Sequence, residues 1–142
     1  MRSIRVIGPR GPRSIHLVLG ALAVAIGGLV LVYRGPGQPF VRGHVGDVAA
    51  TMLVFAIVSL AAVRASIGLR ALVTMAIATS IEVAQVWWHA RSTAGHLVFG
   101  STFDPIDLGA YVVGIGIAIA WERAWMRRRR SGQSTARSGA QN

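Results

Sequence analysis

The sequence predicts an all-α, polytopic membrane protein with four transmembrane helices and cytoplasmic N and C termini. Three observations support this fold class. Hydrophobic residues make up 53% of the chain, charged residues only 14%, and the mean hydropathy is +0.53. Soluble domains carry roughly 25% charged residues. The chain still has a formal net charge of +10, and all fifteen basic residues are Arg. Apolar spans with basic flanks accommodate both properties in one small protein.

Four apolar stretches are each close to the roughly 20 residues that a helix needs to cross a membrane. They cover about residues 15–33, 45–63, 71–88 and 106–125. Membrane strands would be alternating segments of roughly ten residues, and the sequence has none. The first stretch follows a basic segment, residues 1–14, but it is longer than the apolar part of a signal peptide and lacks a cleavage site. We therefore expect all four stretches to be retained as helices.

The distribution of Arg predicts the orientation, because cytoplasmic segments of membrane proteins are enriched in basic residues. Twelve of the fifteen Arg precede the first span, join the second to the third, or lie at or beyond the C-terminal end of the fourth. The other three are Arg34, Arg42 and Arg91. This alternation fits four spans with both termini in the cytoplasm.

The C-terminal segment predicts an interfacial anchor. Trp121 and Trp125 are typical of a helix end at the membrane surface. A basic run follows, and it is expected to contact anionic lipids of the inner leaflet. The run consists of Arg127, Arg128, Arg129 and Arg130. Residues 131–142 are small and polar, so this part of the cytoplasmic tail is predicted to be disordered.

The predicted spans gather most ionisable side chains at the extracytoplasmic end. Four of the five acids and three of the four His lie there. Ionisable residues within spans are costly, so they are functional candidates by default. The candidate polar or ligand site comprises Arg42, His44, Asp47, Glu82, Gln85, His89, Arg91, Asp107 and Tyr111.

Helix capping is an alternative explanation for three of the acids. Asp104 and Pro105 are typical of the cap and first residue of a helix, and Asp107 can bond back to the cap amide. Asp47 follows Gly46 at the entrance to the second span, so helix capping is an alternative explanation for Asp47 too.

Glu82 lies away from any predicted helix end, so capping does not explain it. Two interpretations are open. One is a purely structural ion pair with Arg42 or Arg91. The other is contact with a ligand or a proton. The same helix face holds Thr74, Ala78, Gln85 and His89.

On the fourth span, Asp107, Tyr111 and Gly114 share one face. Ala110, Gly114 and Ala118 have the small-xxx-small spacing that predicts close helix packing. Tyr111 can donate its hydroxyl to Asp107 or to the acid of the third span. Its alternative is a place in the aromatic belt at the membrane surface.

These motifs resemble the VanZ-like superfamily of small bacterial membrane proteins. The matching residues are Glu82-x-x-Gln85, Arg91 and Asp107-x-x-x-Tyr111-x-x-Gly114. VanZ-like proteins usually carry Asn where this chain has Tyr111, and they lack its apolar insertion at residues 95–103. Three further features look more like a sister group, an uncharacterised domain-of-unknown-function family of four-helix proteins. These features are Tyr111, Arg42-x-His44-x-Gly46-Asp47 and Gly100-x-x-Phe103. The resemblance covers about residues 38–118.

The resemblance implies four helices in the bacterial cytoplasmic membrane. The superfamily is named after a member linked to glycopeptide-antibiotic resistance. That link implies a role facing the cell envelope, through surface polymers or lipids.

The leading hypothesis is a binding or accessory protein of the outer leaflet. Arg42, Arg91 and His44 would contact the headgroup of an anionic lipid or envelope precursor, because Arg bonds two phosphate oxygens at once. The carboxylates and Gln85 would orient these cations or accept hydrogen bonds from sugar hydroxyls.

Two alternatives are a small oligomeric transporter or channel and an intramembrane enzyme. The enzyme would use the carboxylate and His cluster, with or without Zn²⁺ or Mn²⁺. It is less favoured, because the sequence has no Cys, no H-E-x-x-H motif and no Ser-centred motif. We predict no cofactor, no metal outside that alternative, and no nucleic-acid partner, because the Arg residues flank apolar runs.

Overall fold

The computed structural model describes the backbone of residues 13–90 and 105–139, and every regular element in these ranges is helical. Within these ranges, three helices are long and apolar enough to cross a membrane. They are Arg13–Val32, Gln38–Ala61 and Ile67–Ala84. The all-α prediction is confirmed for the described residues, and so is the presence of apolar helices of membrane-spanning length.

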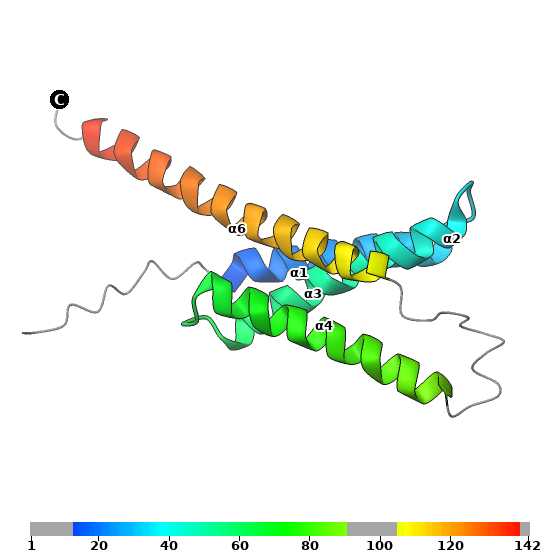
Figure 1. Cartoon of the computed structure of the whole chain (residues 1–142). Helices are drawn as coiled ribbons and strands as arrows, with labels where there is room; N and C mark the ends of the chain where they lie inside the picture. The colour runs from blue at the N-terminus through cyan, green and yellow to red at the C-terminus, as the bar shows by residue number, and fades with distance from the viewer. Residues whose placement is uncertain (1–12, 91–104, 140–142) are drawn as a thin grey trace, which may run out of the picture.

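The bundle is built from four long helical segments (Figure 1). The elements are α1 (Arg13–Val32), α2 (Gln38–Phe40), η1 (Val41–Val45), α3 (Gly46–Ala61), α4 (Ile67–Ala90) and α6 (Pro105–Gly139). The elements α2, η1 and α3 form one run, because Phe40, Val45 and Gly46 all have right-handed helical backbone angles. Asp47 therefore lies inside a helix and caps none, which corrects the capping alternative at that position.

Helix α3 occupies the centre and packs against α1, α4 and α6. The core contains Leu19, Ala23, Met52, Phe55, Ala56 and Ala118. Many large apolar side chains point outward instead, such as Leu29 at 69% exposure and Leu72 at 66%. An apolar surface of this extent is typical of helices that contact lipid.

Helices α3 and α6 approach closely at Gly114. A Cβ atom added there would lie 2.8 Å from the carbonyl oxygen of Val48 and 3.0 Å from the Cβ of Thr51. Ala110 and Ala118, one turn away on either side, are buried. The predicted small-residue packing of the fourth helix is therefore confirmed, and its partner is α3.

Three helix boundaries differ by four residues or more from the predicted ones. The run formed by α2, η1 and α3 begins at Gln38, before the predicted residue 45. Helix α4 begins at Ile67, earlier than the predicted residue 71, so Arg70 belongs to a helix and not to a connection. Helix α6 continues to Gly139, beyond the predicted end at Trp125 and into the segment predicted to be disordered. No Pro interrupts the sequence after Pro105, and Arg is a strong helix former, so nothing local stops the helix at Trp125.

Candidate functional site

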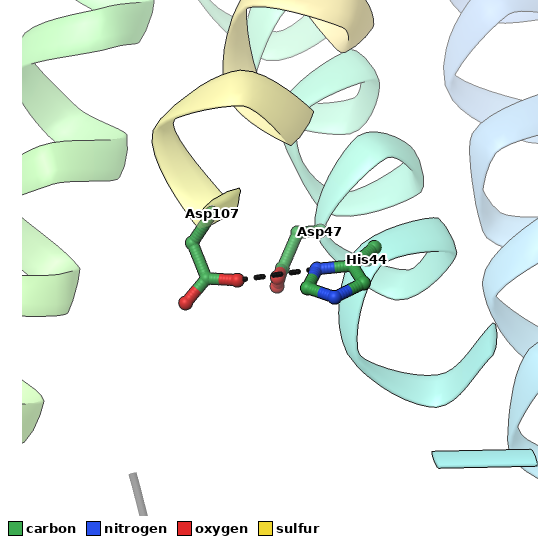
Figure 2. Close-up of side chains that lie close together, drawn as sticks. All are labelled: His44, Asp47 and Asp107. Atoms are coloured by element: carbon green, nitrogen blue, oxygen red, sulfur yellow. Dashed lines mark ion pairs between the residues drawn. The ribbon is translucent and has the colours of Figure 1, made fainter. Parts of the chain in front are cut away.

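Three ionisable side chains from two helical segments meet at one end of the bundle, which we call the acidic end (Figure 2). His44 comes from η1, Asp47 from the first turn of α3 and Asp107 from the first turn of α6. Their ligand-type atoms all lie within 4.8 Å of one another. His44 Nδ1 lies 3.5 Å from Asp107 Oδ1. All three residues are half-buried.

A hydrogen bond between Tyr111 and Glu82 adds α4 to the acidic end. The Tyr111 hydroxyl donates to a Glu82 carboxylate oxygen at 3.0 Å, and both residues are buried. The predicted donation from Tyr111 to the acid of the third span is confirmed, and the aromatic-belt alternative for Tyr111 is wrong. Both residues are close enough to Asp47 to interact with it electrostatically.

The prediction that Thr74 and Ala78 share a helix face with Glu82 is confirmed as well. Thr74 and Ala78 are both buried, as expected for residues spaced one helical turn apart on the packed side of α4. The side chains of Gln85 and His89, and Arg91 as a whole, lie outside the described residues.

Arg42 does not join the acidic end. Its guanidinium donates to the carbonyl oxygen of Leu31 at 2.8 Å, and Arg34 donates to the same oxygen at 3.2 Å. The last carbonyls of a helix lack partners within the helix, and basic side chains commonly satisfy them. Arg42 therefore satisfies a carbonyl group at the C-terminal end of α1. The ion pair between Arg42 and Glu82, one of the two interpretations of Glu82, is not formed.

The charge balance of the acidic end is uneven. Asp47, Glu82 and Asp107 contribute three carboxylates, and no Arg in the described part of the chain forms an ion pair with any of them. The polar groups facing them are the Tyr111 hydroxyl and the His44 imidazole. Asp47 and Asp107 also lie against each other. Among the described residues, hydrogen-bond acceptors therefore outnumber donors at the acidic end.

The family model described as "Protein of unknown function (DUF2809)" matches residues 37–115, more than half of the chain. The chain belongs to the DUF2809 family. The predicted membership of an uncharacterised family is thereby confirmed, and the matched stretch contains every described residue of the acidic end. No curated protein and no solved structure matches the chain.

The DUF2809 chain has a second polar cluster at the opposite end of the bundle, centred on Arg70 and Glu122. The Arg70 guanidinium donates to both Glu122 oxygens, at 2.8 and 3.0 Å, and to the Ser59 hydroxyl at 2.9 Å. It also lies 5.7 Å from the centre of the Phe55 ring. His16 is buried close enough to interact electrostatically with the pair. The cluster joins α3, α4 and α6.

The predicted spans do not indicate this second cluster. They put Arg70 between residues 63 and 71, outside any helix, and Glu122 is the one acid that lies away from the extracytoplasmic end. A signal was present, because Arg70, Thr74, Ala78 and Glu82 follow one another at four-residue intervals along a single helix face. Residues at this spacing lie on the same side of the helix, so the burial of Glu82 indicates that Arg70 is buried as well.

A shallow apolar hollow lies on the outward side of α4, away from both polar clusters. It is lined by Leu72, Met75, Ala76, Thr79, Ser80, Val83 and Ala84. No ionisable group lines it, so it offers a surface for apolar contact and no chemistry. The acidic end is the candidate functional site of this DUF2809 protein.

Proposed function

We propose that the chain is a four-span protein of the bacterial cytoplasmic membrane that binds a lipid headgroup in the outer leaflet. The headgroup would belong to an anionic lipid or an envelope precursor. Both termini would lie in the cytoplasm, as the Arg distribution predicts. A distant relationship to VanZ-like proteins is part of this proposal.

The packing of α6 supports a fourth span. Its apolar first half presents a continuous buried face to the bundle, with Ala110, Tyr111, Ile115 and Ala118 all buried. This half lies against α3 and α4, both of which belong to candidate spans. A helix packed lengthwise against spanning helices shares their place in the membrane. The basic residues Arg127 and Arg128 lie on the same helix beyond this half, where contact with anionic lipid is expected.

The excess of carboxylates at the acidic end carries the headgroup proposal. Carboxylates that are buried or half-buried with too few donors are costly, and the described residues offer these three only the Tyr111 hydroxyl and the His44 imidazole. A ligand that brings hydroxyl or cationic groups supplies the missing donors. Arg42 is exposed on the neighbouring turn, and only one of its guanidinium donors is used by the Leu31 carbonyl, so others remain for a phosphate.

Native mass spectrometry of the purified full chain tests this proposal. We expect the wild type to retain a phospholipid or lipid-linked sugar, and we expect Asp107→Asn and Arg42→Gln to lose it. Arg64→Gln is the matched control, because Arg64 is an exposed Arg in the connection between α3 and α4. Identical lipid profiles for the wild type and both site variants would remove the proposal.

A further inference from the structure

The acidic end has a feature that headgroup binding does not require. His44 Nδ1 is fully buried, although the residue is half-buried, and it has no hydrogen-bond partner. It points toward the two carboxylates (Figure 2). Buried ring nitrogens are normally hydrogen-bonded, so an orphan of this kind needs an explanation. The nitrogen is 3.5 Å from Asp107 Oδ1, which is an ion-pair contact when the imidazole is protonated but is longer than a usual N–H···O hydrogen bond.

We propose that His44, Asp47 and Asp107 bind a divalent transition-metal cation of the Zn²⁺ or Mn²⁺ class. Two ligands placed 2.1 Å from a tetrahedral metal are about 3.4 Å apart, close to the observed separation of His44 from Asp107. The other separations stay within 4.8 Å, so small side-chain rotations bring all three atoms to one ion.

The ligand set and its charge select the class of cation. One imidazole and two carboxylates suit Zn²⁺ or Mn²⁺, whereas Mg²⁺ and Ca²⁺ prefer oxygen ligands alone. A divalent ion offsets the charge of Asp47 and Asp107 and leaves the three-ligand set neutral, which matters where the dielectric constant is low. Three protein ligands leave at least one coordination position open. That position can accept water or a phosphate oxygen.

Three features of the fold hold the ligands in place. The π-helical turn η1 sets the direction of His44 relative to Asp47, and π turns occur frequently at functional sites. The Phe40 ring packs edge-on against the His44 ring, with ring centres 4.7 Å apart. Gly114 lets α6 approach α3 closely, which brings Asp107 to the Asp47 end of α3.

Metal titration of the full-length chain in mild detergent tests the inference. The protein is treated with a chelator, and Zn²⁺, Mn²⁺ and Mg²⁺ are then added separately in calorimetry, with elemental analysis after gel filtration. We expect one Zn²⁺ or Mn²⁺ per chain, bound at least tenfold more tightly than Mg²⁺. Removing a ligand by His44→Gln, Asp47→Asn or Asp107→Asn should weaken binding by roughly tenfold or more.

Ser80→Ala is the matched control, because Ser80 is exposed on α4, outside the acidic end, and its hydroxyl donates to the Ala76 carbonyl of its own helix. It should leave the metal affinity unchanged, because it alters neither a ligand nor a residue bonded to a ligand. Visible absorption of the Co²⁺-substituted wild type provides a readout that needs no variant, and we expect the bands of a site with nitrogen and oxygen ligands. A folded wild type that binds no stoichiometric metal would overturn the inference. So would an Asp107→Asn protein that binds the metal as tightly as the wild type.

The metal and headgroup proposals fail separately. Metal binding without a retained lipid would leave the cation site intact and remove the headgroup. A retained lipid in a chain that binds no metal would support the headgroup proposal and remove the cation site.

Discussion

Replacing only one partner of the ion pair between Arg70 and Glu122 should destabilise the bundle far more than replacing both partners. Both side chains are only 7% exposed, and three hydrogen bonds of 2.8 to 3.0 Å hold the guanidinium. Glu122→Gln leaves a buried Arg70 without a counter-charge, and Arg70→Met leaves a buried carboxylate. Each single change should lower the free energy of unfolding by about 3–5 kcal/mol.

The double variant Arg70→Met, Glu122→Leu should recover most of that loss. It leaves no uncompensated charge, and apolar replacement of a buried pair is often neutral or stabilising. Among the described residues it leaves unmade the hydrogen bond to Ser59, a neutral hydroxyl whose lost bond is worth about 1 kcal/mol.

Unfolding by SDS in mixed micelles, followed by circular dichroism, measures these differences. Ser80→Ala serves as a control, because Ser80 is exposed on α4 and bonds only within its own helix. Single variants within about 0.5 kcal/mol of the wild type would refute the reasoning, because that result means that the pair is solvated. A double variant no more stable than the singles would show that the pair itself, rather than an uncompensated charge, supplies the stability.

Three further outcomes are expected. Tyr111→Phe should lower stability by about 1–3 kcal/mol in the same assay, because the lost hydrogen bond ends on a carboxylate, and a double-mutant cycle with Glu82→Gln should show strong coupling. Gly114→Val should destabilise by about 1–3 kcal/mol through a clash with Thr51, and an unchanged unfolding midpoint would contradict the close approach of α3 and α6. A reporter fused after Gln38 should give an extracytoplasmic signal in cells, and a cytoplasmic signal would reverse the orientation.

The sequence predicted those features that depend on one helix at a time. Hydropathy and length located the apolar helices, and four-residue spacing placed Glu82 and Thr74 on the packed side of α4. The small residues around Gly114 predicted a close helix contact, although not that α3 would be the partner. Such features follow from local periodicity, which is present in a single sequence.

The sequence did not predict features that depend on which helices are neighbours. Asp47 resembled a helix cap, because the preceding Gly46 suggested a helix start, yet the π-helical turn continues the helix through it. In the sequence, Arg70 looked like one of the basic residues that set the orientation in the membrane. In the structure, α6 places Glu122 against it. His44 and Asp107 are far apart in sequence, so only the packing of α6 on α3 brings them together.

The two polar clusters bear on the transporter alternative, because they lie at opposite ends of α4 and α6. A proton or ion path between them would need polar groups along the buried face of α4, between Arg70 and Glu82. That stretch contains Thr74, whose hydroxyl already donates to the Arg70 carbonyl, and then Ala78. On α6 the corresponding buried residue is Ala118. Within the described residues, a small apolar layer thus separates the clusters, which favours a binding site at one end over a route through the bundle.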